Sequence, residues 1–352
     1  MADDVRKEEE YSGAKPVEER HRFDERRLDA WMHENVEGYE GPLVVLQFKG
    51  GQSNPTYRLN TPGRTYVMRR KPFGKLLPSA HAVDREYRVI EALGKQGFPV
   101  ARAYVLCQDD SIIGAAFYIM SMEEGRVFWD PTLPSQPPED RRKIFTSKIE
   151  TLAQLHMFDP NAIGLSDFGK PGNYFARQID RWTKQYRASE TQHIAEFEKV
   201  AEWLPRTVPD QARVSIVHGD YRLDNMIFHP TEPRVQAVLD WELSTLGDPM
   251  ADFTYLLMQW IMPGLEGADL KALNILSLEE AAQIYCNVTR MNVPDLNWYF
   301  AYNLFRLAGI TQGIAGRIRD GTAANAKALE SAKRTVPLSK ASWEYAQKAG
   351  AV

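Results

Sequence analysis

The sequence has little cysteine, no long apolar run and no excess of basic charge. Its two cysteines, Cys107 and Cys286, lie far apart and fit no metal-binding spacing, so we expect neither a disulfide framework nor a structural zinc site. The formal net charge of −4 argues against nucleic acid as a partner. No apolar run reaches the roughly 18 residues of a transmembrane helix, and the charged N-terminus lacks a signal-like segment. We therefore expect a cytoplasmic protein with no membrane partner.

Residues that favour strands are concentrated in the first third of the chain, and helical spacing dominates the rest. β-Branched and aromatic runs between turn residues predict strands at 43–49, 55–60, 65–70, 101–107 and 116–121, with one helix at 79–97. Apolar residues spaced by three and four predict later helices at 138–158, 175–186 and 298–319, and short strands at 214–218, 226–229 and 235–239. We predict an α+β protein with a flexible tail (1–22), a β-rich lobe with one helix (23–121) and a larger helical lobe (122–352).

Polar residues with oxygen donors follow two of the short later strands. Asp220 and Asn225 stand in the segment VHGDYRLDN, and Asp240 ends the next strand, AVLD. Residues at strand ends can project into a common mouth, and carboxylate and amide oxygens are the ligands that Mg²⁺ prefers. Turn formation and helix capping are the alternative for any one of them alone. As a set, these residues favour a magnesium site.

The pattern H-G-D-x-x-x-x-N, then Asp240, then G-D-P-x-x-D resembles the catalytic core of the aminoglycoside phosphotransferase and choline kinase group. That group is related to the protein kinases, and the resemblance covers about residues 25 to 320. It implies a two-lobed protein-kinase-like fold whose N-terminal lobe is an antiparallel sheet. The stretch RRKPFGKLLPSAHAVDREYRV (69–89) resembles more closely the kinase-like domain fused to some acyl-CoA dehydrogenases.

The resemblance implies a role for each residue of the pattern. Asp220 becomes the catalytic residue that accepts or orients the proton of a substrate hydroxyl, while Asn225 and Asp240 become ligands of Mg²⁺ on the phosphates of ATP. Tyr221 and Arg222, inside the same loop, are candidates for contact with the substrate. His218 becomes architectural. Asp248 and Pro249 are expected to start a helix, on which Asp252 would brace the catalytic loop.

A cation for the nucleotide phosphates is expected from the β-rich lobe. Arg69 shares its strand face with Val67, and Glu86 lies on an apolar face of the 79–97 helix, where a lone carboxylate is costly. An Arg69–Glu86 pair would satisfy both groups and direct the guanidinium to phosphate, although an ordinary structural ion pair is the alternative. Arg70, next in sequence, is expected to be solvated.

Two further segments are expected to contact the nucleotide. Gly50, Gly51 and Ser53 form the first hairpin turn, whose backbone N–H groups could donate to phosphate oxygens. Ser121 and Met122 would join the lobes and read the adenine through backbone groups.

These residues predict a small-molecule kinase that transfers the γ-phosphoryl group of ATP to a hydroxyl of a small metabolite. The second resemblance favours a hydroxyacyl thioester as the acceptor, and an aminoglycoside is an alternative. Another alternative is a nucleotide-binding regulatory module without turnover. Arg69 in place of the usual kinase lysine favours this alternative. The features that oppose it are the three residues Asp220, Asn225 and Asp240. The sequence does not fix the oligomeric state.

Overall fold

The chain forms two compact units. The computed structural model describes residues 13–49, 54–73, 81–211, 213–262, 265–292, 295–322 and 326–352. The first unit comprises the segments Met1–Phe168, Arg222–Ser244 and Gly267–Ser277, and the second comprises Gly169–Tyr221, Thr245–Glu266 and Leu278–Val352. The first unit thus takes in segments beyond residue 121, so the expected division of the chain at that point stays a prediction.

A six-stranded sheet with the order β1-β2-β3-β4-β6-β5 dominates the N-terminal part of the first unit. Its strands are β1 (Ala14–Lys15), β2 (Val44–Phe48), β3 (Thr56–Asn60), β4 (Thr65–Arg70), β5 (Ala103–Cys107) and β6 (Phe117–Ser121). Every neighbouring pair in this sheet is antiparallel. The five predicted strands and their antiparallel pairing are confirmed, and β1 was not predicted. Residues 1–12 of the expected tail lie outside the described residues.

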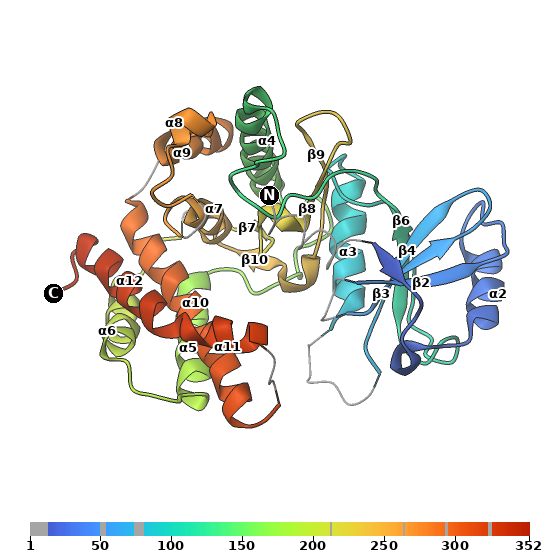
Figure 1. Cartoon of the computed structure of the whole chain (residues 1–352), viewed down its shortest axis with the longest axis horizontal. Helices are drawn as coiled ribbons and strands as arrows, with labels where there is room; N and C mark the ends of the chain where they lie inside the picture. The colour runs from blue at the N-terminus through green and yellow to red at the C-terminus, as the bar shows by residue number, and fades with distance from the viewer. Residues whose placement is uncertain are drawn as a thin grey trace. The chain divides into compact units, whose positions relative to one another are not determined.

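The two faces of the sheet are covered by different helices (Figure 1). Helix α2 (Glu25–Asn35) buries Leu28 and Met32 in a cluster that includes Tyr66 and Met68 of β4. Because successive side chains of a strand point to opposite faces, Val67 and Arg69 face the other side, where helix α3 (Val83–Gly94) lies. The helix predicted at 79–97 is confirmed by α3, whereas α2 was missed.

The expectation that Arg70 is solvated was wrong. Arg70 lies on the α2 face of β4 and its side chain is 0% exposed. Its guanidinium lies 3.6 Å from the centroid of the Phe73 ring and donates to the Tyr57 hydroxyl at 2.9 Å. Aromatic faces attract a guanidinium because of their quadrupole, so this cation is stabilised within the fold.

The first unit also contains a two-stranded hairpin and two further helices. Strands β8 (Met226–Phe228) and β9 (Val235–Val238) pair antiparallel, with Met226 opposite Val238. The other helices of the unit are α4 (Pro138–Met157) and the short α8 (Leu270–Leu273). The two predicted strands at 226–229 and 235–239 and the helix at 138–158 are confirmed.

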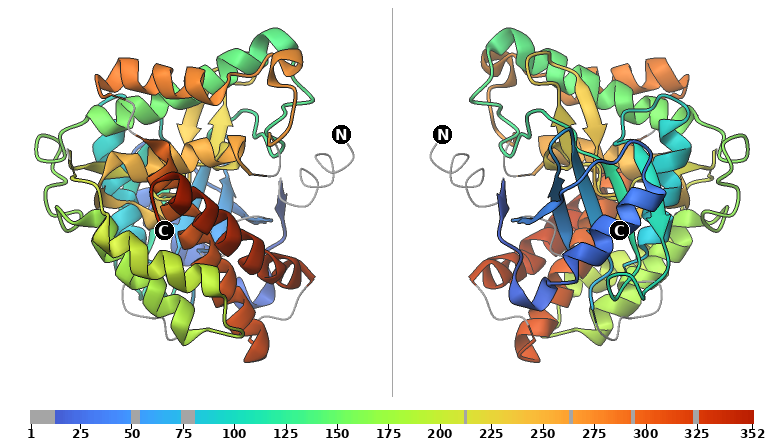
Figure 2. Two further views of the ribbon diagram at one scale, coloured as in Figure 1. Left: turned by 90° about the vertical axis from the view of Figure 1, so that its left-hand side faces the viewer. Right: turned by 90° about the vertical axis from the view of Figure 1, so that its right-hand side faces the viewer.

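The second unit is mainly helical. Its helices are α5 (Tyr174–Ala188), α6 (Ala195–Trp203), α7 (Pro249–Leu257), α9 (Leu278–Thr289), α10 (Leu296–Arg319), α11 (Ala326–Lys333) and α12 (Thr335–Lys348). Figure 2 shows α10 and α12 side by side. Strand β7 (Ser215–Val217) pairs antiparallel with β10 (Thr245–Gly247), a strand that the sequence did not predict. The expected larger helical part is therefore confirmed. No helix in the described part of the chain is long and apolar enough to cross a membrane.

Candidate functional site

The β8–β9 hairpin brings Asn225 and Asp240 to the same edge of the first unit. Asn225 immediately precedes β8 and Asp240 follows the end of β9, and in an antiparallel pair these two ends are neighbours. The Leu239 N–H donates to the Asn225 carbonyl at 2.9 Å, which ties the two ends together. Asp240 adopts a left-handed conformation with φ of 64°, one that Asp tolerates better than most residues. This part of the predicted convergence is confirmed.

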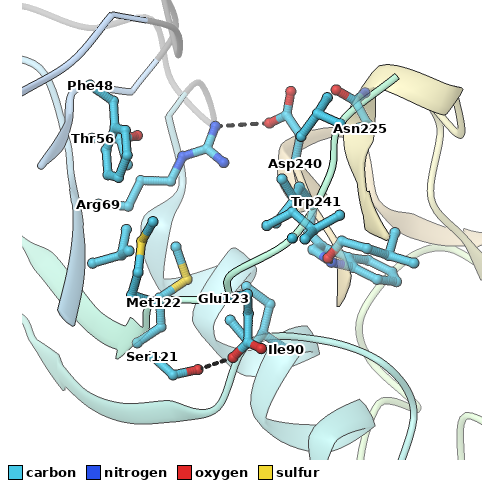
Figure 3. A pocket seen from close by; sticks show the side chains of 18 of the residues that line it. Phe48, Thr56, Arg69, Ile90, Ser121, Met122, Glu123, Asn225, Asp240 and Trp241 are labelled. Atoms are coloured by element: carbon cyan, nitrogen blue, oxygen red, sulfur yellow. Dashed lines mark hydrogen bonds and ion pairs between the residues drawn. The ribbon is translucent and has the colours of Figure 1, made fainter. Parts of the chain in front are cut away.

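Arg69 joins the hairpin to helix α3. Figure 3 shows its side chain pointing toward Asp240, with Asn225 beside that carboxylate. Arg69 Nη2 lies 2.8 Å from Asp240 Oδ1, and Arg69 Nε lies 3.2 Å from Glu86 Oε2. Nη2 also lies 3.5 Å from Glu242 Oε2. The predicted Arg69–Glu86 pair is confirmed, and the sequence analysis did not anticipate Glu242, which stands only two residues after Asp240.

Glu86 is held in place by neutral donors as well as by Arg69. Its carboxylate is 1% exposed and accepts from Asn54 Nδ2 at 2.6 Å and from the Tyr118 hydroxyl at 3.2 Å. Burial raises the pKa of Glu86, while Arg69 acts to lower it. The bond from Asn54 ties the segment just before β3 to α3. Gly50, Gly51 and Ser53 themselves lie outside the described residues.

An apolar cavity of about 440 Å³ opens beside this cluster within the first unit. Its lining comes from the sheet, from α3, from the β8–β9 hairpin and from connecting segments, and includes Val67, Ile90, Ala101, Met120, Met122, Trp129, Ile227 and Val238. Arg69, Asn225 and Asp240 line it as well. Ligand pockets of about 300–1,000 Å³ with apolar walls and a few convergent polar groups typically bind small molecules. The cavity therefore combines apolar walls with a few charged and amide groups, as a small-molecule pocket does.

Ser121 and Met122 both line this cavity, at the end of β6. The Ser121 N–H donates to the Arg102 carbonyl at 2.9 Å, and the Ser121 hydroxyl donates to Glu123 Oε1 at 2.5 Å. The Ser121 N–H is therefore already hydrogen-bonded within the fold. The expectation that backbone groups of Ser121 and Met122 read the adenine stays a prediction.

Asp220 belongs to the second unit, in the loop that follows β7. Asp252 of α7, only 1% exposed, accepts from the N–H groups of both His218 and Gly219, the latter at 2.8 Å. The Asp220 N–H donates to His218 Nδ1 at 3.2 Å. Gly219 has a φ of 88°, which a residue with a side chain rarely adopts. The predicted bracing of this loop by Asp252 is confirmed, and the architectural role of His218 stays a prediction.

Two further residues of the second unit contact the loop that carries Asp220. Neither contact was predicted from the sequence. The Tyr255 hydroxyl of α7 donates to Asp220 Oδ1 at 3.0 Å. Arg306 of α10 donates from Nη2 to the Gly219 carbonyl at 2.6 Å, and its guanidinium lies 5.0 Å from the centroid of the Tyr255 ring. Tyr255 stands three residues after Asp252 on the same helix, a spacing that places both on one face.

The two residues predicted to contact substrate have contrasting surroundings. Tyr221 is 1% exposed and packs edge-on to the His218 ring, with 5.8 Å between ring centroids. Arg222 is exposed and lies 3.3 Å from the Asp224 carboxylate. The burial of Tyr221 favours a structural role, and contact with substrate stays a prediction for both residues.

The donor set around Asp240 fits a magnesium ion shared with a substrate. Among the described residues no group of three or more His, Cys, Asp or Glu could hold a metal on its own. Asn225 and Asp240 supply amide and carboxylate oxygens at one cavity. Mg²⁺ typically keeps several waters and binds one or two protein oxygens together with substrate phosphates, so two protein ligands are sufficient.

Comparison with known proteins identifies relatives over nearly the whole chain. The sequence model of the phosphotransferase enzyme family matches residues 44–284. Acyl-CoA dehydrogenase family member 10 from mouse is 44% identical over an aligned length of 320 positions, and the match covers 88% of this chain and 30% of that protein. Family member 11 from chicken is 40% identical over an aligned length of 358 positions, gaps included, and the match covers 96% of this chain and 45% of that protein. The chain thus spans less than half the length of these relatives.

Solved structures give the same assignment. A crystal structure from Ralstonia eutropha JMP134, described as a candidate aminoglycoside phosphotransferase, is 51% identical, with a TM-score of 0.87 over 93% of this chain and 99% of that one. The aminoglycoside phosphotransferase APH(4)-Ia, solved with AMP-PNP and hygromycin B, is 14% identical with a TM-score of 0.58, over 90% of this chain and 98% of that one, and shares the fold. The predicted kinase-like fold is confirmed, and the chain belongs to the phosphotransferase enzyme family.

Proposed function

We propose that this chain is a small-molecule kinase that transfers the γ-phosphoryl group of ATP to a hydroxyl of a small metabolite. The observation that carries the proposal is the cluster of Arg69, Glu86 and Asp240 at the end of an apolar cavity, in a chain of the phosphotransferase family. The AMP-PNP bound to APH(4)-Ia supports a nucleotide as the phosphoryl donor.

In this proposal the first unit binds the nucleotide. The adenine lies in the apolar cavity and is read by backbone groups of Ser121 and Met122, while Arg69 donates to the phosphates. Asn225 and Asp240 hold Mg²⁺, which when bound would neutralise the charge of the phosphates. Gly50, Gly51 and Ser53 are proposed to cover the phosphates with backbone N–H groups.

Asp220 orients the acceptor hydroxyl and accepts its proton. The acceptor oxygen forms a bond to the γ-phosphorus as the bond from that phosphorus to the bridging oxygen breaks, and ADP leaves with the electron pair of that bond. Most of the rate enhancement in such a transfer comes from positioning and from charge neutralisation. The buried hydrogen bonds around Gly219 support a fixed position for Asp220.

We favour a hydroxyacyl thioester as the acceptor, because the curated relatives are named acyl-CoA dehydrogenase family members. This chain matches only part of those proteins, so their names support the acceptor class indirectly. An aminoglycoside is the second candidate, which the description of the Ralstonia relative supports.

A screen of acceptors tests both candidates. ADP release would be measured with Mg²⁺ and ATP, using CoA thioesters hydroxylated at the second, third or fourth acyl carbon, kanamycin and hygromycin B. We expect turnover with a thioester, reduced about 10²–10⁴-fold in Asp220→Ala with ATP binding retained. Turnover with the antibiotics alone would select the second candidate. ATP binding measured by calorimetry without turnover on any acceptor would favour a regulatory module.

A further inference from the structure

We propose that Tyr255 and Arg306 are positioning residues that fix the carboxylate of Asp220 for the transfer step. The inference rests on the proposed function, because it assigns a role within that reaction. It concerns two contacts inside the second unit, the Tyr255 hydroxyl on Asp220 Oδ1 and the Arg306 guanidinium on the Gly219 carbonyl.

Both backbone polar groups of Gly219, the residue before Asp220, are hydrogen-bonded. The Gly219 N–H donates to Asp252 and the Gly219 carbonyl accepts from Arg306, at 2.8 and 2.6 Å. Asp252 lies on α7 and Arg306 on α10, so two helices hold opposite polar groups of one glycine. Hydrogen bonds to charged groups are stronger than those between neutral groups. These bonds fix the position of the Asp220 Cα and leave its side-chain torsions to be set.

Tyr255 sets the side chain. Its hydroxyl has one proton to donate, and the bond to Oδ1 fixes the plane of the carboxylate at 3.0 Å from the phenol oxygen. A carboxylate can accept about four hydrogen bonds, so this contact leaves capacity for a substrate hydroxyl. The half-buried Arg306 guanidinium packs against the Tyr255 ring and restricts its movement. Arg306 therefore acts on Asp220 twice, through the Gly219 carbonyl and through Tyr255.

Catalytic groups must be held close to the reactive geometry before substrate arrives, because reorganisation during the reaction raises the barrier. The absence of the Tyr255 hydroxyl should therefore lower kcat with little change in the affinity for ATP, which the first unit is proposed to bind. A merely structural tyrosine would lower thermal stability and affect both constants.

The test compares Tyr255→Phe with wild type and with Tyr299→Phe, using the hydroxyacyl-CoA thioester that gives the highest turnover in the screen above. Tyr299 is a buried tyrosine of α10 and serves as the matched control. We expect Tyr255→Phe to lower kcat about 10-fold or more with the KM for ATP within about two-fold of wild type. Tyr299→Phe should leave both constants unchanged.

Measuring Tyr255→Phe in an Asp220→Asn background distinguishes an effect that acts through Asp220 from a general effect on the fold. If Tyr255 acts through Asp220, Tyr255→Phe causes no further loss there. Arg306→Gln, measured in both backgrounds, gives the same comparison if Tyr255→Phe does not fold. Wild-type kcat in Tyr255→Phe, or an equal loss in both backgrounds, overturns the inference while leaving the proposed function intact. A wild-type protein that transfers phosphate to no acceptor overturns the proposed function, and the inference with it.

Discussion

The two units hold their key carboxylates in opposite ways. In the first unit, Asp240 is about one-third exposed and bonded to the charged side chain of Arg69. In the second unit, Asp220 follows a backbone segment whose N–H and carbonyl groups are bonded to Asp252 and Arg306, and its carboxylate accepts from a neutral hydroxyl. Asp240 is thus held by a charged side chain of the sheet, and Asp220 by groups on the helices α7 and α10.

This difference matches the roles that we propose for the two units. Arg69 is surrounded by three carboxylates, from Glu86, Asp240 and Glu242, so one positive charge faces three potential negative charges. A ligand that brings a phosphate and a divalent cation can exchange partners with such a cluster, because phosphate can replace Asp240 on Arg69 and the cation can replace Arg69 on Asp240. The loop before Asp220 offers no comparable exchange, since Asp252 and Arg306 bind its backbone N–H and carbonyl groups.

Among substitutions in the cluster around Arg69, Asp240→Asn should lower turnover the most. The variant keeps an oxygen near Arg69 but lacks the charge that we propose holds the metal. A metal ion supplies several kcal/mol of transition-state stabilisation, so turnover should fall roughly 10³-fold or more. The measurement is initial rate against Mg²⁺ concentration at saturating ATP, where the half-saturating concentration should rise sharply.

Glu242→Gln is the matched control for Asp240→Asn. Glu242 faces the same Nη2 of Arg69, at 3.5 Å, and we assign it no metal. Its substitution should change the dependence on Mg²⁺ far less than Asp240→Asn does. Equal changes in the two variants would show that the charge of the cluster matters and that Asp240 has no special part in metal binding.

Arg69→Met tests whether this arginine has a structural role, a nucleotide role or both. Removing the cation leaves the buried Glu86 without its charged partner, and breaking a buried ion pair in this way costs about 3–5 kcal/mol. We expect the free energy of unfolding to fall by about 3 kcal/mol and the Kd for ATP to rise at least about 10-fold. Chemical denaturation and calorimetry measure the two effects.

The double variant Arg69→Met, Glu86→Gln separates these two effects. A neutral glutamine can still accept from Asn54 through its carbonyl oxygen, and its NH2 group can donate to the Tyr118 hydroxyl, so stability should return most of the way to wild type. The affinity for ATP should stay low, because no cation faces the phosphates. Recovery of both quantities would show that Arg69 acts on nucleotide only by neutralising Glu86.

The sequence predicted the elements that alternate or repeat clearly, and missed those that depend on distant partners. The strand at 65–70 was predicted from its residues, and the pattern placed Val67 and Arg69 on one face. The burial of Arg70 could not be predicted, because it depends on Phe73, on Tyr57 and on a helix, α2, that was itself missed. A buried guanidinium is stabilised by the faces around it, and local sequence does not show those faces.

The site was predictable where a residue type matches a chemical need and less so where a residue only supports another. Asn225 and Asp240 stand at strand ends and carry oxygen donors, so their meeting could be expected. Tyr255 and Arg306 reach the catalytic loop through the packing of α7 and α10 in the second unit. Their spacing in the sequence, 51 residues on the numbering of the chain, contains no signal of that contact.

Two buried carboxylates of the second unit, Asp252 and Asp248, differ in the hydrogen bonds that they accept. Asp252 accepts from two backbone N–H groups, whereas Asp248, 4% exposed, caps α7 and accepts from the Met250 N–H at 2.9 Å. Burial raises the pKa of Asp248 from 3.8 to about 6. Between these two values the folded state binds a proton that the unfolded state does not. The stabilising contribution of Asp248 is therefore complete below pH 3.8 and is lost as the pH rises through about 6.

Asp248→Asn should remove this dependence while keeping an oxygen that caps the helix. The variant gains most over wild type above pH 6, where wild type buries a charged carboxylate. We expect its advantage in free energy of unfolding to be ~1 kcal/mol smaller at pH 5 than at pH 7.5. Urea denaturation at both pH values measures this, with Asp295→Asn, at the exposed cap of α10, as the matched control. An advantage that is equal at both pH values would mean that the carboxylate of Asp248 stays charged, and that the second unit accommodates a buried charge with a single N–H donor.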